Sequence, residues 1–315
     1  MKTKSKIQNP KPKICLTIAG FDPSGGAGII ADIKTFTAFG CFATAAVTSL
    51  TFQNTCGVFG AEHQSAKTLR GQIEPLVEDF EISAVKTGML PSREIIEETA
   101  QIIKENKLKN LVVDPVIRST SGFDLIDDGA LRALIETLFP LADIVTPNLP
   151  EAEKIAQIKI ENEADIERAA RIMQAFGAKN VLIKGGHFLN AECGMRNAEL
   201  NGVQSSKFKV QSSKTEDQKQ KTEIQSGNSQ LMIARDYLFV GEDLHLFEAE
   251  FIETNATHGT GCTLASAIAA NLALGKNLIE AVGIAKKFVT EAIRAAPNLG
   301  NGNSPINHSI LDFRF

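Results

Sequence analysis

Short apolar runs alternate with helical patterns along the first 186 residues, and this rhythm limits the possible folds more than any other feature of the sequence. The apolar runs have the length and composition of buried strands and cover 14–20, 45–53, 82–88, 110–116, 142–148 and 180–186. The helical patterns between them cover 26–40, 66–79, 92–107, 128–138, 150–157 and 163–177. Elements that alternate in this way predict an α/β fold with a mostly parallel central sheet and helices on both faces.

The composition excludes several classes of protein. A chain of 315 residues, 43% hydrophobic and 22% charged, can bury one large core, and its net charge of −4 argues against non-specific nucleic-acid binding. No stretch is long enough to span a membrane, and the basic first residues are not followed by the apolar core of a signal peptide. The five cysteines include no CxxC pair, so we expect a reducing, cytoplasmic location and no disulfide framework.

The domain organisation is expected to be simple. Residues 1–13 are predicted to form a flexible tail, and residues 14–315 a single domain. One segment at about 201–230 is rich in Ser, Gln, Lys and Glu and has too few apolar residues to fold alone. Its composition favours a surface insertion, and a lid over a ligand site is the alternative.

Polar motifs follow the ends of the predicted strands, where parallel sheets bind their ligands. They are Gly20 to Gly28, Gln53, Lys86 to Met89, Asp114 to Arg118, Asn148, and Lys184 to His187. The glycines of "GFDPSGGAG" (20–28) let backbone amides approach a ligand, although the loop could also be only a tight turn. It matches neither a Walker A loop nor a Rossmann fingerprint.

The motif "THGTGC" (257–262) precedes an apolar helix expected at about 263–274. Gly259 and Gly261 permit a turn whose amides point one way, and the helix dipole adds positive potential. Such a turn suits the charge of a transferring phosphoryl group, and a glycine-rich helix start without a ligand is the alternative. A helix N-terminus lowers the pKa of a thiol, so Cys262 could act as a base at neutral pH or only pack as a small residue.

Asp114, Asn148 and Glu151 lie at the ends of two predicted strands. Oxygen ligands of this kind suit Mg²⁺ bound partly through water, but the same residue types often cap helices. Lys184 ends a strand and could carry phosphate charge or be simply exposed. The histidines have no HxH or HExxH spacing, so a metal site built from them is not expected.

In order and spacing, these motifs resemble the hydroxymethylpyrimidine/phosphomethylpyrimidine kinases of thiamine biosynthesis, members of the ribokinase-like superfamily. The matching stretches are "LTIAGFDPSGGAGIIADIKTFTAFG", "TSLTFQNTCGV", "VKTGML", "VVDPV", "TPNLPEAE", "LIKGGH" and "THGTGCTLASAIAA". The resemblance implies a ribokinase-like three-layer fold. It also implies ATP- and Mg²⁺-dependent phosphorylation of 4-amino-5-hydroxymethyl-2-methylpyrimidine to its monophosphate and then to the diphosphate, by a homodimer.

The resemblance also implies roles for individual residues. The pyrimidine pocket would include Gly20, Asp32, Gln53, Met89, Val116 and the catalytic candidate Cys262. Gly259, Thr260 and Gly261 would form the anion hole, with Asn148 and Lys184 at the nucleotide phosphates and Asp114 and Glu151 at the metal. The side chains are compatible with this: an amide such as Gln53 can donate to one ring atom and accept from another, while Met89 and Val116 offer apolar surface.

Two other functions remain open at this point. A pyridoxal kinase would hold a similar hydroxymethyl heteroaromatic ring, so the same residues discriminate weakly between the two. A catalytically silent vitamin- or nucleotide-binding protein is the rival from another class, although it would need neither an anion hole nor metal-side carboxylates. The expected ligands are small molecules, with no nucleic-acid or membrane partner.

Overall fold

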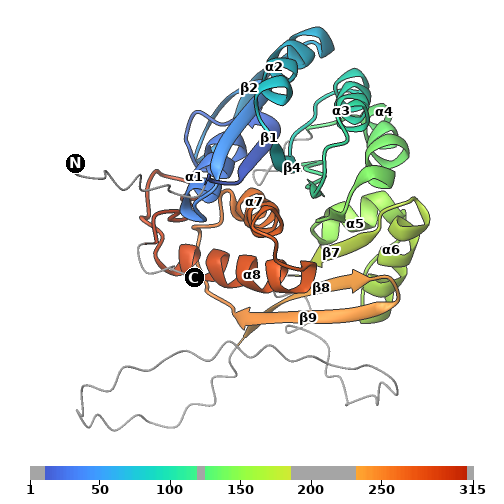
Figure 1. The fold of residues 1–315 in the computed structure, drawn as a ribbon. Helices are drawn as coiled ribbons and strands as arrows, with labels where there is room; N and C mark the ends of the chain where they lie inside the picture. Colours follow the sequence, from blue (N-terminus) through green and yellow to red (C-terminus); the bar gives the residue numbers. More distant parts are fainter. Residues whose placement is uncertain (1–10, 119–124, 186–231, 311–315) are drawn as a thin grey trace, which may run out of the picture.

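The structure, a computed structural model, describes residues 11–118, 125–185 and 232–310. Its centre is a nine-stranded sheet in the order β3-β2-β1-β4-β5-β6-β7-β8-β9 (Figure 1). The strands are β1 (Ile14–Phe21), β2 (Phe42–Asn54), β3 (Gly57–His63), β4 (Ile82–Thr87), β5 (Leu111–Val113), β6 (Ile144–Val145), β7 (Asn180–Lys184), β8 (Ile233–Val240) and β9 (Asp243–Glu250).

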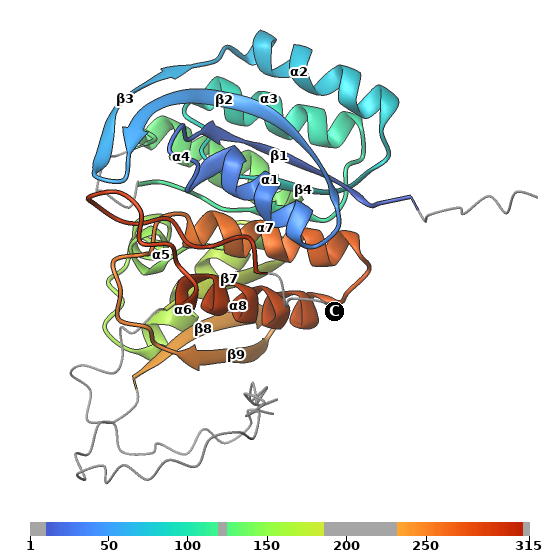
Figure 2. The ribbon, with the colours of Figure 1, turned by 90° about the vertical axis from the view of Figure 1, so that its left-hand side faces the viewer.

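Six neighbouring strands pair in parallel, from β2 through β1, β4, β5 and β6 to β7. This confirms the mostly parallel sheet. Antiparallel strands complete both edges: β3 pairs with β2, while β8 and β9 follow β7 as a hairpin. Figure 2 shows β2 and β3 as a long curved ribbon at one end of the sheet.

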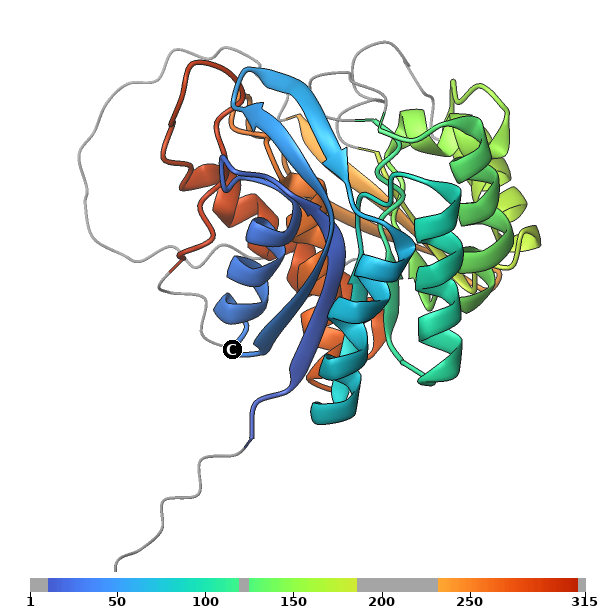
Figure 3. The same cartoon turned by 90° about the horizontal axis from the view of Figure 1, so that it is seen from above.

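Helices cover both faces of the sheet, as predicted (Figure 3). One layer contains α1 (Gly28–Ala38), α7 (Thr260–Ala273) and α8 (Leu278–Arg294). The other contains α2 (Ala66–Asp79), α3 (Arg93–Glu105), α4 (Asp128–Ala133), α5 (Leu149–Ala156) and α6 (Glu163–Ala175). The fold therefore has three layers, helix on sheet on helix.

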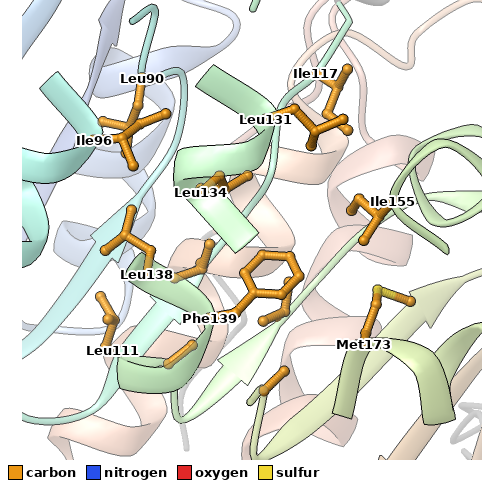
Figure 4. Close-up of a cluster of buried hydrophobic side chains, with 14 of the residues drawn as sticks. Leu90, Ile96, Leu111, Ile117, Leu131, Leu134, Leu138, Phe139, Ile155 and Met173 are labelled. Atoms are coloured by element: carbon orange, nitrogen blue, oxygen red, sulfur yellow. The ribbon is translucent and has the colours of Figure 1, made fainter. Parts of the chain in front are cut away.

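Each helical layer has its own apolar core against the sheet. Figure 4 shows part of the core beneath α3 to α6, where Leu90, Ile96, Leu134, Phe139 and other side chains meet. Burial of one such side chain contributes about 1.5–3 kcal/mol. The second core lies between the sheet and α1, α7 and α8 and is rich in alanine along α7, which lets this helix approach the sheet closely.

Several helix starts follow directly from local sequence. Ser92 caps α3 by accepting a hydrogen bond from the backbone amide of Ile95. Asn148 and Glu151 form a reciprocal capping box at the start of α5. In contrast, α7 begins at Thr260, three residues before the predicted start, because Gly259 adopts a left-handed conformation that ends the preceding loop.

Two sequence-based expectations fall wholly or mostly on residues that the structure does not describe. The predicted insertion at 201–230 lies outside the described residues, and so do the first ten residues of the predicted tail. Among the helices of the described ranges, none combines the length and the hydrophobicity that crossing a membrane requires.

Candidate active site

The loop between β1 and α1 is held in a compact shape by Asp22. The Asp22 carboxylate accepts hydrogen bonds from the backbone amides of Ser24 and Ala27, each at 2.8 Å. At the end of the loop Gly28 has a φ of +56°, and a Cβ there would lie 2.2 Å from the carbonyl oxygen of Gly20. Only glycine fits such a position, so the loop is closely folded on itself.

The second glycine-rich loop packs directly on the first. Gly259 has a φ of +82°, and a Cβ at this position would lie 1.8 Å from the carbonyl oxygen of Gly26. Immediately after it Thr260, Gly261 and Cys262 form the first turn of α7. Amides of a first helical turn have no carbonyl partner within the helix, and the helix dipole makes this end positive. The first turn of α7 is therefore a candidate anion site, and it is called the anion site below.

A cavity of about 810 Å³ joins these two loops to the carboxyl ends of the central strands. All of the predicted site residues except Asp32 line it. They are Gly20, Gln53, Met89, Asp114, Val116, Asn148, Glu151, Lys184, Gly259, Thr260, Gly261 and Cys262. Val116 has a φ of +40°, which is rare for a β-branched residue and is typical of strained backbone at functional sites.

Asp32 lies behind the cavity wall instead of on its surface. It is fully buried in α1 and forms an ion pair with Lys86, whose Nζ atom lies 2.9 and 3.0 Å from the two carboxylate oxygens. Thr17 and Ser266 each donate a further hydrogen bond of 2.6 Å to this carboxylate. Lys86 does line the cavity, so Asp32 can influence the site through Lys86.

Lys184 is a largely buried cation close to the anion site. Its Nζ atom lies 2.9 Å from the Asp114 carboxylate, and a Cβ added to Gly261 would be only 3.2 Å from the same nitrogen. Burial alone would lower the pKa of Lys184, but the carboxylates of Asp114 and Glu151 raise it above its ordinary value. A permanent positive charge therefore stands beside the first turn of α7.

The two candidate metal carboxylates lie near each other but already have partners. Asp114 accepts a hydrogen bond from Thr146 in addition to its contact with Lys184. Glu151 accepts from the backbone amides of Asn148 and Ile117, and burial raises its pKa while Lys184 opposes that rise. Asn148 and Glu151 are thus helix-capping residues that also face the cavity. Among the described residues no cluster of three His, Cys, Asp or Glu side chains could hold a metal by itself.

The expected lowering of the Cys262 pKa is wrong. Burial raises the pKa of this thiol to about 11; the positive charge of Lys86 opposes the rise, and Asp32 adds to it. Desolvation therefore outweighs the positive charge of Lys86. Cys262 faces the cavity chiefly as a neutral thiol at physiological pH, which removes the support for its role as a base.

Three residues of the site received no role from the sequence motifs. Two of them are Asp22 and His258, and the Asp22 carboxylate lies 2.8 Å from the Nε2 atom of His258. The third is Lys86. The signals were present, because Asp22 and His258 lie within the two glycine-rich motifs and Lys86 is a charge inside an apolar strand. What the sequence alone could not supply was the pairing between them.

A C-terminal segment, residues 298–308, connects the walls of the site. The amide of Asn303 donates to the carbonyl of Thr55 in the turn after β2, and the amide of His258 donates to the carbonyl of Ser304. Further along, His308 is hydrogen-bonded through Nε2 to the Thr263 hydroxyl at 2.9 Å. Figure 2 shows this dark red segment beside the turn between β2 and β3.

The cavity also extends away from the anion site, toward α8 and β9. There a largely buried ion pair joins Lys286 and Asp236 at 2.7 Å. Apolar side chains of Phe251, Val289 and Ile293 line the same end. The cavity therefore includes polar groups at the ends of the central strands as well as apolar side chains near α8 and β9.

Comparison with known sequences gives consistent results. A sequence model of the phosphomethylpyrimidine kinase family matches residues 22–221 and 221–307. A Haemophilus influenzae protein named hydroxymethylpyrimidine/phosphomethylpyrimidine kinase is 39% identical over 297 residues, which are 94% of this chain and 96% of that protein. The thiamine biosynthesis bifunctional protein ThiED of Geobacter sulfurreducens is 41% identical over 93% of this chain, which corresponds to 51% of that longer protein.

Solved structures with the same architecture come from two kinds of kinase. A phosphomethylpyrimidine kinase from Clostridium difficile superposes with a TM-score of 0.68 at 39% identity and covers 89% of this chain and 99% of its own. A pyridoxal kinase from Bacillus subtilis, in complex with ADP, superposes with a TM-score of 0.77 at 33% identity, and the match covers 96% of this chain and 100% of that kinase.

Proposed function

Because this chain belongs to the phosphomethylpyrimidine kinase family, we propose that it phosphorylates 4-amino-5-hydroxymethyl-2-methylpyrimidine with ATP and then phosphorylates the monophosphate to the diphosphate. The reaction would serve thiamine biosynthesis, as the name of the Geobacter relative suggests. A silent binding protein is disfavoured, since the relatives are named as kinases.

The observation that carries this proposal is the continuity of the cavity. The anion site of Gly259 to Cys262 lies in the same cavity as Gln53, Met89 and Val116. A ring held by Gln53 and flanked by the two apolar side chains can thus present a hydroxymethyl group near the first turn of α7. The apolar end at α8 and β9 has room for a second ligand group, as a nucleotide donor requires.

Different residues of the site would contribute to different parts of phosphoryl transfer. Backbone amides at Gly261 and Cys262 and the ammonium of Lys184 stabilise the charge on the transferring group. Lys86 places a second buried positive charge near Cys262. Such transfer passes through a loose transition state that needs little help from a base, so the neutral Cys262 thiol can act by packing against the ring.

The carboxylates are compatible with Mg²⁺ held mostly by nucleotide phosphates and water. Mg²⁺ commonly takes only one or two protein carboxylates in such sites. Asp114 and Glu151 both face the cavity, and each retains oxygen lone pairs beyond its present hydrogen bonds. The ion would neutralise charge on the phosphates, and Asp114 and Glu151 would be the residues that hold it.

Pyridoxal phosphorylation is a second candidate function. The observation in its favour is the likeness to the Bacillus subtilis pyridoxal kinase over nearly the whole of both chains. Its substrate also carries a hydroxymethyl group on a heteroaromatic ring. The two functions are separated by the ratio of kcat/KM for the two substrates.

The proposal includes a cytoplasmic homodimer. Its support is an exposed apolar surface on the β2–β3 edge, where the side chains of Phe52 and Phe59 are 55% and 72% exposed. Exposed apolar surface of this kind is typical of interfaces between subunits. Analytical ultracentrifugation of the wild-type protein and of Phe59→Glu tests the dimer, because a charge in an apolar interface would shift the equilibrium toward the monomer.

The decisive experiment is an ATP-dependent assay with the pyrimidine alcohol that follows both the monophosphate and the diphosphate. The matched variant is Gln53→Leu, which keeps much of the volume and removes both polar groups of the amide. Unpaired ring groups should then cost about 1–3 kcal/mol, seen as a KM raised by roughly 5- to 150-fold. Absence of turnover with the pyrimidine alcohol would contradict the proposed function.

A further inference from the structure

The C-terminal segment, residues 298–308, lies against the cavity wall without lining the cavity. Three alternate residues anchor it, because Ser304, Ile306 and His308 are only 2%, 3% and 6% exposed. Residues 298–308 are all described in the structure, and none of them lines the cavity. Any effect of the segment on a bound ligand therefore passes through the residues that it holds in place.

The first of these residues is Thr55. The amide of Asn303 donates to the Thr55 carbonyl at 2.8 Å, and the amide of Gly302 donates to the Thr55 hydroxyl at 3.3 Å. A Cβ at Gly302 would lie 2.2 Å from that carbonyl oxygen, and a Cβ at Gly300 would lie 2.2 Å from the hydroxyl oxygen. The segment can therefore approach Thr55 this closely only with glycine at both positions.

Thr55 lies in the turn that joins two residues of the cavity wall. β2 ends at Asn54 and β3 begins at Gly57, so Thr55 is between these strands. Next to the turn, Gln53 and Val58 are opposite each other in the strand pairing, and both line the cavity. We call this pair the ring wall, because Gln53 is the residue expected to bind the ring. Holding Thr55 therefore holds the ring wall.

The segment also contacts the loop and the helix of the anion site. The amide of His258 donates to the carbonyl of Ser304 at 3.2 Å. His308 is hydrogen-bonded to the hydroxyl of Thr263, in the first turn of α7, at 2.9 Å. Because Asn303 and Ser304 are consecutive in the chain, the ring wall and the anion site are attached to the same short stretch of backbone.

We propose that the C-terminal segment sets the separation between the ring wall and the anion site, with Thr55 as the positioning residue through which it acts. This inference rests on the proposed function and deepens it. A reacting group displaced by about 1 Å can lose about 10²-fold in rate, so a small movement of the ring wall is enough to slow transfer. The anion site keeps its own support from Gly259 packed on Gly26, so nucleotide binding does not depend on Thr55.

The first variant that breaks the contact with Thr55 is Gly302→Ala. Gly302 does not have a positive φ, so the added methyl group meets the Thr55 carbonyl without further backbone strain. The matched control is Gly57→Ala, at the other side of the same turn. Gly57 also lacks a positive φ, and a Cβ there would meet nothing within 4 Å.

The second variant, Gly300→Ala, breaks the same contact in a way that can be reversed. Its Cβ would clash with the side chain of Thr55 and not with the backbone, so adding Thr55→Gly removes every atom in the clash. Gly300 has a φ of +79°, and the matched control is Gly40→Ala, where φ is +74° and a Cβ would meet nothing within 4 Å.

For each protein, kcat and KM are measured with the pyrimidine alcohol, and calorimetry measures the dissociation constants of the ring and of ADP. Relative to their controls, Gly302→Ala and Gly300→Ala should lower kcat/KM for the ring by about 10- to 100-fold and keep the dissociation constant of ADP within about twofold. The fall should appear in kcat as well as in KM, because a misaligned ring reacts slowly even when it is bound. Adding Thr55→Gly should recover most of the loss in Gly300→Ala.

Three outcomes would overturn the inference. They are a kcat/KM for the ring equal to that of the controls, an equal weakening of ring and ADP, which would make the segment only a support of the fold, and no recovery when Thr55→Gly is added to Gly300→Ala. The proposed function fails separately, if the wild type phosphorylates neither the pyrimidine alcohol nor pyridoxal. The dissociation constants of the two rings then decide the inference, because loss of the contact with Thr55 must still weaken the ring and spare ADP.

Discussion

Gly259→Ala should disable phosphoryl transfer while leaving most of the protein folded. The added Cβ would lie 1.8 Å from the carbonyl oxygen of Gly26, whereas real contacts of this kind are at least about 3.0 Å. The two loops would therefore have to separate by roughly 1 Å, and no side-chain rotation can avoid this because the contact is with backbone. A displacement of about 1 Å at a reacting centre can cost about 10²-fold in rate, similar to the loss of one oxyanion donor.

The matched control is Gly275→Ala. Gly275 has a φ of +85°, almost the same as Gly259, but a Cβ there would meet nothing within 4 Å. Both variants share the cost of a left-handed alanine, about 1–2 kcal/mol, so the difference between them isolates the contact between the loops. Turnover is followed by ADP release and folding by thermal melting. If Gly259→Ala keeps at least half of the turnover of Gly275→Ala, the close packing of the two loops does not shape the anion site.

Three further predictions concern ionisable groups of the interior and of the cavity wall. Cys262→Ser should keep turnover within about 10-fold of the wild-type value between pH 6 and 9, because the thiol, with a pKa of about 11, is neutral over this range. A loss of about 10²–10⁴-fold would instead show that the thiol acts as a base. Lys86→Met should lower the free energy of unfolding in urea by about 3–5 kcal/mol by leaving Asp32 buried and unpaired, and adding Asp32→Leu should recover part of that loss. Burial lowers the pKa of His308 from 6.5 to about 4, so the contribution of this residue to stability is complete above pH 6.5 and is lost as the pH falls toward 4. In urea unfolding, the free energy of unfolding of His308→Asn should therefore depend less on pH in this range than that of the wild type. The same pH dependence in both proteins would contradict the prediction.

The parallel half of the fold could be predicted because local and global signals agree there. Apolar strands such as β1 alternate with helices whose starts carry a capping side chain, Ser92 in α3 being an example. The strands β3, β8 and β9 were not predicted. In β3 and β9 few residues are buried, since each lies at an edge of the sheet, so neither shows a clean alternation of apolar and polar residues.

The candidate site was predictable residue by residue but not in its pairings. Every predicted site residue except Asp32 lines the cavity, because the motifs sit at strand ends and the topology brings those ends together. The burial of Asp32 did have a signal, as it lies on the apolar face of α1 with Ile29 and Phe36. The raised pKa of Cys262 had none, since desolvation depends on what covers the thiol in three dimensions.

The C-terminal segment has a consequence for the way this enzyme is made. It links Thr55 and His258 through Asn303 and Ser304, so this connection cannot form until residues about 250 positions after Thr55 have left the ribosome. Contacts this distant in sequence form late and slowly in folding. A nascent chain that carries both glycine loops and the whole parallel sheet would still lack the closing contacts of its pocket. Catalytic competence should therefore arise after translation has passed residue 308, well after the core has begun to form.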